Sequence, residues 1–184
     1  HEIRNPLVTI GGFARSLLRT PHEVERVQRN AQIIADEVQR LEELLTDMLD
    51  LARPSTLVLR PEQLHTILDQ AWLLTSGEVQ HDAPVELRKK YDPELPDVYV
   101  DARSLLRAFL NVLRNAVQAM PEGGTLSLTT RSLGSEALVA IADTGGGIPR
   151  HVLSTIFTPF SSHRVRGTGL GLSITQQIIA EHGG

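Results

Sequence analysis

The first part of the chain carries a regular pattern of apolar residues separated by polar ones. In two runs the apolar positions advance by alternating steps of four and three residues, which is the spacing of a coiled-coil seam. The runs are Ile3, Leu7, Ile10, Ala14 and Leu17, then Val24, Val27, Ala31, Ile34, Val38, Leu41, Leu45, Met48 and Ala52. The pattern predicts two helices. Between them, Thr20, Pro21 and Glu23 are typical of a capping box, with Thr20 as N-cap and Pro21 as the first helical residue.

The expected hairpin carries an apolar stripe wider than these seams. Its additional members are Phe13, Leu18, Ile33, Leu44, Leu49 and Leu51. A lone hairpin would leave such a stripe in water, so we expect two copies of the chain to pair into a four-helix bundle. The alternative is that the hairpin packs on the C-terminal part of its own chain. The length and regularity of the second run favour the homodimer.

The pattern changes after a short linker at Pro54 and Ser55, which divides an expected domain 1–53 from an expected domain 54–184. Alternating apolar residues predict strands at 56–59, 85–91, 97–101, 125–131 and 136–145. Longer apolar periods predict helices at 61–79, 102–120 and from 171 onward. Pro61 would open the first of these helices, and Asp101 would cap the second. The expected class is α+β, a helical hairpin followed by a sheet covered by helices on one face.

Composition restricts the classes of function. The chain has 184 residues, of which 41% are hydrophobic and 22% charged, as in soluble globular proteins. Its net charge of −4 argues against a nucleic-acid partner. The sequence has no cysteine, which excludes disulfides, cysteine-zinc sites and thiol catalysis and agrees with a reducing, cytoplasmic location. No apolar run approaches the ~20 residues of a membrane span, so a membrane anchor is expected only upstream, in a longer parent protein.

Two asparagines interrupt an apolar helix. Asn111 and Asn115 lie four residues apart and therefore share a helix face with leucine, phenylalanine and valine neighbours. Two amide oxygens at this spacing could hold a hydrated Mg²⁺, which needs few protein ligands. Equally, the pair could be structural and bond to neighbouring loops.

Glycines mark two further segments. Asp143 ends a strand and is followed by Gly145 and Gly147, which would let the backbone pass close to a flat ligand while the carboxylate accepts from an amine. The glycine-rich turn 167–173 leads into a helix, and helix N-termini of this kind favour phosphate. Between them, residues 150–166 are long enough for a mobile lid, with Phe157 and Phe160 as expected anchors.

The chain opens with His1 and Glu2, and Pro6 follows inside the first helix. His1 lies two residues before Ile3, roughly 200° around the helix from the seam, and is expected to face solvent. Most exposed histidines are ordinary surface residues. Pro6 argues against that interpretation, because a proline inside a helix removes a hydrogen bond and kinks the axis.

In their order and spacing these segments resemble the boxes of sensor histidine kinases. NVLRNA (111–116) resembles the N box of the GHKL superfamily, DTGGGI (143–148) the first glycine box, FTPF (157–160) the F box and GTGLGL (167–172) the second glycine box. HEIRNPL resembles the H box, and residues 37–54 resemble the second helix of the dimerisation and phosphotransfer domain. The resemblance implies a dimeric four-helix bundle followed by a GHKL-type sandwich, in which helices cover a mixed sheet.

The resemblance also implies a site for ATP and Mg²⁺. Asn115, with Asn111, would coordinate the Mg²⁺ that bridges the phosphates, and Asp143 would accept a hydrogen bond from the adenine amine. The other expected nucleotide contacts are Gly145, Gly147, Ile148, Phe157, Gly167, Thr168, Gly169, Leu170 and Gly171.

His1 would then take the γ-phosphoryl group and pass it to an aspartate on the receiver domain of a response regulator. Glu2 would orient the imidazole and accept its proton, since attack requires a neutral ring nitrogen. Asn5 would position the water that dephosphorylates the regulator, and the kink at Pro6 would ease bending of the helix.

The sequence departs from the family pattern at the lid and at both ends. Where the F box continues into two hydroxyl residues and a lysine, this chain has Ser161, Ser162 and His163, with Arg164 and Arg166 following. A cationic contact to phosphate would come from an arginine or from protonated His163. Family members extend the first helix upstream and add a strand hairpin after the final glycines. We therefore expect a longer parent protein, with the last strands of the sheet and the sensor region outside this chain.

Other functions are less well supported. GHKL ATPases hydrolyse ATP with a glutamate at the first N-box position, where this chain has Asn111, so phosphoryl transfer to a side chain is favoured. A catalytically inactive, nucleotide-binding scaffold is disfavoured because His1, Asn115 and Asp143 are all present. A serine kinase of the anti-sigma type would lack the hairpin.

Overall fold

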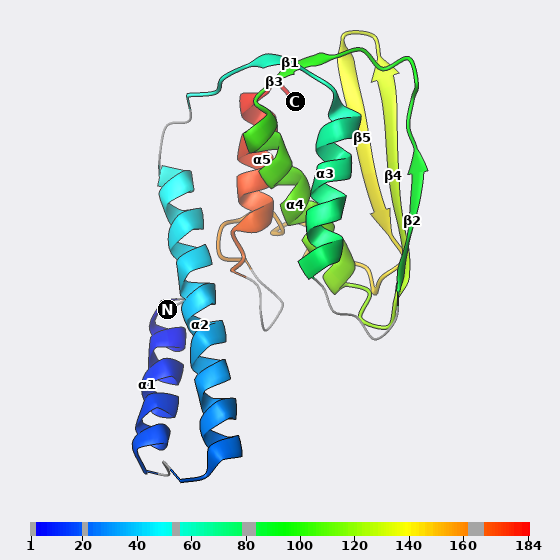
Figure 1. Cartoon of the computed structure of the whole chain (residues 1–184). Helices are drawn as coiled ribbons and strands as arrows, with labels where there is room; N and C mark the ends of the chain where they lie inside the picture. The colour runs from blue at the N-terminus through cyan, green and yellow to red at the C-terminus, as the bar shows by residue number, and fades with distance from the viewer. Residues whose placement is uncertain (1–2, 20–21, 53–55, 79–83, 162–167) are drawn as a thin grey trace.

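The computed structural model describes residues 3–19, 22–52, 56–78, 84–161 and 168–184. Two antiparallel helices form an extended hairpin, and a layered arrangement of helices and strands follows it (Figure 1). The elements are α1 (Arg4–Arg19), α2 (Val24–Ala52), β1 (Arg60–Glu62), α3 (Leu64–Glu78), β2 (Val85–Lys90), β3 (Val98–Val100), α4 (Ala102–Gln118), β4 (Gly124–Leu133), β5 (Glu136–Asp143) and α5 (Gly171–Glu181). This order confirms the α+β class, whereas the domain boundary at residue 53 lies outside the described residues and stays a prediction.

The hairpin contains a buried polar contact between its helices. Asn30 on α2 is 5% exposed, and its Nδ2 donates to the Oγ of Ser16 on α1 over 3.1 Å. The helix α2 begins at Val24, so the predicted start at Pro21 is wrong. The Glu23 side chain, expected to reach back to a cap, pairs instead with Arg26 of the first helical turn at 3.3 Å. Thr20 and Pro21 lie outside the described residues.

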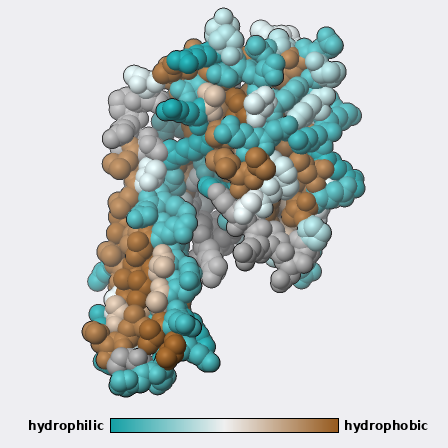
Figure 2. Space-filling view, in the orientation of Figure 1, coloured by the Kyte–Doolittle hydropathy of each residue, from teal (hydrophilic) through white to brown (hydrophobic). Residues whose placement is uncertain are grey.

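Part of the apolar stripe on the hairpin is exposed. Its exposed members include Ile3, Leu7, Leu18, Val24, Val38, Leu45 and Leu49. Figure 2 shows apolar surface running along the hairpin. Leu44 is fully buried, however, and Met48 packs against the same core, which belongs to the C-terminal region (residues 56–184). One face of α2 therefore packs on its own chain, and another remains uncovered.

The C-terminal region is built on a three-stranded mixed sheet. The central strand β4 runs parallel to β2 and antiparallel to β5. A separate two-stranded sheet pairs β1 with β3. The helices α3, α4 and α5 lie together on one face of the larger sheet, as predicted (Figure 1). Leu126 and Leu128 of β4 are fully buried and share one core cluster with Leu113 of α4.

The helix α4 begins where the sequence indicates. The Oδ1 atom of Asp101 accepts from the backbone N–H groups of Arg103 and Ser104 at 3.1 and 3.0 Å. Its Oδ2 atom accepts from the N–H of Val58 at 3.0 Å. The bond from Val58, followed by those of the helix cap, lowers the pKa of the Asp101 carboxyl below its usual value. One carboxylate therefore fixes both the start of α4 and the segment that leads from the hairpin.

Two predictions near the linker are wrong. Residues 56–59 form no strand, and pairing starts at Arg60 opposite Val100. Pro61 lies in β1 opposite Tyr99, and α3 begins only at Leu64. A proline is accepted in the first turn of a helix and also in an edge strand, because its missing N–H is not needed at either place. Pairing with the distant strand β3 decides between these possibilities.

Candidate functional site

A cleft of about 630 Å³ lies between α2, α4 and the glycine-rich segments that follow β5 and precede α5. Helix α2 contributes Gln39, Glu42, Glu43, Thr46 and Asp47, and α4 contributes Arg107, Leu110, Asn111, Arg114, Asn115 and Gln118. The other lining residues are Gly147, Ile148, Pro149, Val152, Ile156, Ser161, Thr168, Gly169, Gly171 and Leu172. Segments far apart in the sequence thus bring most of the predicted nucleotide contacts into one cavity.

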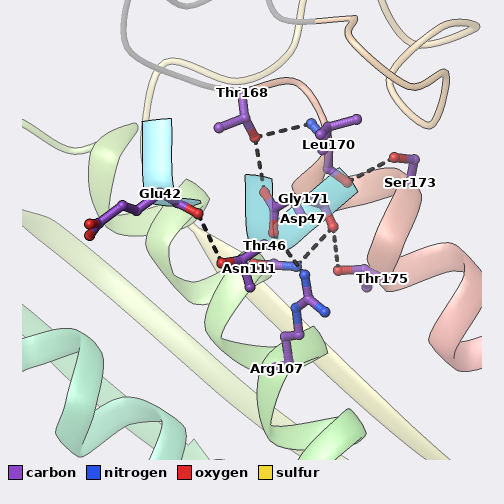
Figure 3. Close-up of polar contacts among 10 residues, drawn as sticks. All are labelled: Glu42, Thr46, Asp47, Arg107, Asn111, Thr168, Leu170, Gly171, Ser173 and Thr175. Carbon is purple, nitrogen blue, oxygen red and sulfur yellow. Dashed lines mark hydrogen bonds and ion pairs between the residues drawn. The ribbon is translucent and has the colours of Figure 1, made fainter. Parts of the chain in front are cut away.

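Asn111 and Asn115 both face this cleft from α4. The Nδ2 of Asn111 donates to the backbone carbonyl of Gly171 over 3.0 Å, which ties α4 to the first turn of α5 (Figure 3). The structural interpretation of Asn111 is therefore confirmed. It does not compete with a metal role, because the amide N–H group makes this bond and a metal would take the amide oxygen.

Asp143 and Gly145 are arranged by the end of β5. The exposed Asp143 carboxylate accepts from the N–H of Gly145 over 2.9 Å. A Cβ atom at Gly145 would lie 2.5 Å from the carbonyl oxygen of Ala119, so this glycine is required for close approach to the end of α4. Of the first glycine box, Gly147 and Ile148 line the cleft, and Gly147 has a φ of +68°. A contact from Asp143 to adenine stays a prediction.

The second glycine-rich segment passes close to the predicted lid. Gly169 has a φ of +69°, and a Cβ atom there would lie 2.7 Å from the backbone of Phe160. Leu170 is fully buried, and its N–H donates to the Oγ1 of Thr168 over 3.3 Å. Helix α5 then starts at Gly171 without a side-chain cap. Backbone N–H groups and the helix dipole at this end therefore point a partial positive charge toward the cleft.

The predicted lid is anchored by different residues than expected. Phe157 and Phe160 are 44% and 46% exposed, so their prediction as anchors is wrong. Val152 is 6% exposed and supplies the buried contact. Successive turn bonds, from Val152 N–H to the carbonyl of Pro149 and onward to Ser161, fold the segment without a regular helix. These short repeated turns leave the side chains of both phenylalanines largely exposed.

Several predicted functional residues lie outside the described part of the chain. These are His1, Glu2, Ser162, His163, Arg164, Arg166 and Gly167. Asn5 is exposed on α1, and Pro6, in the first turn of the same helix, is buried. The catalytic roles of His1, Glu2 and Asn5 stay predictions, as does the helix bending expected at Pro6.

The acidic wall of the cleft was not foreseen. Asp47 of α2 forms an ion pair with Arg107 of α4 at 2.8 Å and accepts from the Oγ1 of Thr168 at 3.3 Å (Figure 3). Asp47 is a polar position in the seam pattern, which indicates only that it lies off the seam. No signal in the sequence pairs it with a residue on a distant helix.

Among the described residues, no group of three or more histidine, aspartate and glutamate side chains could hold a metal ion. A metal in this cleft would therefore need further ligands, such as amide oxygens or oxygens of a bound ligand. The described helices also include none that is both long and apolar enough to cross a membrane.

Two family models match the chain. The His Kinase A (phospho-acceptor) domain matches residues 1–57. The domain described as histidine kinase-, DNA gyrase B- and HSP90-like ATPase matches residues 100–184. The two matched segments contain the hairpin and the helices and strands that form the cleft.

Curated relatives share the whole chain. Sensor histidine kinase ZraS of Escherichia coli (strain K12) is 33% identical over 184 residues, and the chain spans 39% of that protein. Sensory histidine kinase/phosphatase NtrB of Escherichia coli O157:H7 is 35% identical, and the chain spans 54% of it. The chain thus corresponds to about half, or less, of the length of these relatives.

Solved structures share the fold. Histidine kinase ThkA, in complex with the response regulator protein TrrA, matches with a TM-score of 0.81 at 27% identity, over 100% of this chain and 53% of that one. Full-length ShkA, in complex with AMPPNP, matches with a TM-score of 0.71 at 28% identity, over 98% of this chain and 39% of that one. Both likenesses include the hairpin together with the C-terminal region.

Proposed function

Because the chain belongs to the histidine kinase family by both of its domains, we propose that it phosphorylates His1 from Mg-ATP and transfers the phosphoryl group to an aspartate of a response regulator. The observation that carries the proposal is the cleft. It gathers both N-box asparagines and part of each glycine box beside α2, a helix that lies within the residues matched to the phospho-acceptor domain.

The residues of the cleft suit a metal-bound triphosphate. The start of α5 at Gly171 offers backbone N–H groups, and Arg107 and Arg114 add positive charge. Asn111 and Asn115 would hold Mg²⁺ through their amide oxygens, and the bound ion would neutralise charge on the transferring phosphate. The solved complex of ShkA with AMPPNP supports a nucleotide in such a domain.

At His1 the proposed reaction transfers the γ-phosphoryl group of ATP from an oxygen of ADP to a ring nitrogen of the histidine. A neutral imidazole nitrogen attacks the γ-phosphorus, an N–P bond forms, the bond to the bridging oxygen breaks and ADP leaves. The proton on the other ring nitrogen passes to Glu2, which also holds the ring in the reactive tautomer. The proposal for both residues is supported by the family match over residues 1–57.

Asn111 argues for transfer to a side chain rather than hydrolysis. Its Nδ2 donates to the carbonyl of Gly171, a bond that a glutamate at this position could not make. The local structure is thus built around an amide, which cannot act as the general base that activates water. Ordinary ATP hydrolysis is accordingly disfavoured.

The partners we propose are a receiver domain and a second copy of the chain. The complex of ThkA with TrrA supports a response regulator as partner. The exposed apolar stripe of the hairpin, matched to a phospho-acceptor domain, supports the homodimer. The name of the relative NtrB describes it as both kinase and phosphatase. This supports a second activity of the chain, dephosphorylation of the response regulator, in which Asn5 positions the attacking water.

Calorimetry with Mg-ATP tests the nucleotide site. Asn115→Ala should abolish Mg-ATP binding, because it removes an amide oxygen proposed to hold the metal. Gln70→Ala removes an amide from the exposed surface of α3 and serves as the matched control, with affinity expected to equal that of the unmodified chain. Unchanged affinity in Asn115→Ala would refute the metal role.

A further inference from the structure

One stretch of α2 is built into the wall of the cleft. Leu44 is fully buried, and Met48 packs against the core of the C-terminal region. Asp47 lies between these two positions and lines the cleft. The segment that docks the hairpin therefore carries a carboxylate into the space proposed for nucleotide.

Both oxygens of Asp47 are engaged by the walls of the cleft. Oδ1 lies 2.8 Å from the Nη2 of Arg107, and Oδ2 accepts from the Oγ1 of Thr168 over 3.3 Å (Figure 3). Arg107 belongs to the helix that carries Asn111, one turn earlier. Thr168 belongs to the glycine-rich segment before α5. A single side chain of the hairpin thus holds two separate parts of the site.

Water screens this ion pair only in part. The side chains of Arg107 and Asp47 are 28% and 20% exposed, compared with 65% and 61% for the pair Arg88–Glu86 on the sheet. An ion pair shielded from solvent, with a further hydrogen bond to one partner, holds its geometry better than a fully exposed pair. Asp47 is therefore suited to fix α2 against the C-terminal region.

The groups that Asp47 engages are of the kind that bind phosphate. A guanidinium and a loop hydroxyl beside a helix N-terminus are typical donors to phosphate oxygens. A carboxylate presents a similar pair of anionic acceptor oxygens to the same donors. Asp47 and the phosphates of a nucleotide would then compete for Arg107 and Thr168.

We propose that Asp47 is an internal competitor of nucleotide phosphate, and that it latches α2 onto the cleft until nucleotide displaces it. The inference rests on the proposed function of this cleft as a nucleotide site. Linkage makes the coupling reciprocal, so nucleotide binding frees α2, and any signal that pulls α2 away raises nucleotide affinity. The latch would thereby connect the hairpin that carries His1 with loading of the ATP-binding domain.

Nucleotide affinity tests the competition. AMPPNP with Mg²⁺ should bind Asp47→Asn about fivefold tighter than the unmodified chain, because no docked carboxylate has to be displaced. Glu43→Gln removes the same charge from an exposed position on the same wall and is the matched control. An equal gain in AMPPNP affinity in Glu43→Gln would show that loss of any negative charge on this wall is sufficient, and it would overturn the proposal.

The position of α2 tests the latch itself. Because the sequence has no cysteine, spin labels can be placed at Gln28→Cys on α2 and Gln70→Cys on α3, both exposed. The label distance should change when AMPPNP saturates the protein, and Asp47→Asn and Arg107→Gln should show the changed distance without nucleotide. Only Asp47→Asn should also bind nucleotide more tightly, because Arg107→Gln removes a phosphate donor. Thermal melting monitored by circular dichroism confirms that each variant is folded.

The outcomes separate the latch from the proposed function. Failure of the unmodified chain to bind AMPPNP would contradict the nucleotide site, and the latch as a competitor would fall with it. Normal AMPPNP binding with no change in label distance, and with equal affinity in Asp47→Asn, would overturn the latch alone.

Discussion

The C-terminal region and the helical hairpin bury their apolar side chains to different extents. The C-terminal region buries apolar side chains between its helices and its sheet, and Leu113, Leu126 and Leu128 are fully enclosed. The hairpin leaves leucines such as Leu45 half-exposed, and a buried contact between its helices is the polar pair of Asn30 with Ser16. The C-terminal region therefore encloses a well-buried core, to which α2 adds Leu44 and Met48, whereas the rest of the hairpin has apolar surface that needs a partner.

This difference suits a division of tasks. A binding cleft needs rigid walls, which a closed core supplies. A hairpin with an uncovered stripe can pair with another copy, and a buried asparagine in such a helix pair specifies register at some cost in stability. Asp101 and Asp47 connect the regions, the first at the linker and the second at the cleft.

The largest effect is expected in the C-terminal core. Leu113→Ala should lower the free energy of unfolding of this region by about 3 kcal/mol, because it leaves a cavity among well-packed side chains. Urea unfolding followed through the fluorescence of Trp72, the sole tryptophan, which packs against this core, measures the change. A loss below about 1 kcal/mol would show that the core is loosely packed, and the contrast with the hairpin would fail.

An intermediate effect is expected at the connection between the regions. Asp101→Ala should cost about 1 kcal/mol at neutral pH, because it removes the cap of α4. The pKa of Asp101 is lowered in the folded chain, so its contribution is fully present above the unfolded pKa of ~3.9 and is lost as pH falls through the folded value. Urea unfolding at several pH values should show the two chains converging in acid. A constant difference down to the lowest pH would contradict the role of the charge.

The smallest effect on the C-terminal region is expected from the hairpin. Leu45→Ala should change the unfolding free energy measured through Trp72 by less than ~0.5 kcal/mol, because Leu45 is 50% exposed and lies on the uncovered face of α2. The melting of the hairpin should instead depend on protein concentration over about a hundredfold range, and Leu45→Ala should lower its midpoint. Melting independent of concentration in both chains would count against the homodimer.

Local sequence signals predicted much of the fold. Asp101, which precedes a long apolar period, correctly predicted the start of α4. The alternation of apolar and polar residues predicted strands β2, β4 and β5. Asn111 and Gly171 could be assigned to one site only through the family resemblance, since their contact spans a separation of 60 residues. The order of motifs in the family indicates that such distant segments belong to one site, which the periodicity of apolar residues does not show.

The errors have physical causes beyond the reach of local pattern. Pro61 fits a helix start as well as an edge strand, and only its pairing with Tyr99 distinguishes them. Phe157 and Phe160 were expected to anchor the lid, but repeated turns leave both side chains exposed. For Asp47 the repeat indicates only a position off the seam, and its contacts with Arg107 and Thr168 are set by tertiary docking.

Phosphorylation of His1 is the measurement that decides the proposed function. After incubation of the protein with γ-labelled ATP and Mg²⁺, we expect an acid-labile, base-stable phosphoprotein that is absent in His1→Gln. His22→Gln, which alters an exposed histidine near the hairpin turn, should keep the label and serves as the control. Label retained in His1→Gln would contradict the assignment of His1 as the phosphate acceptor.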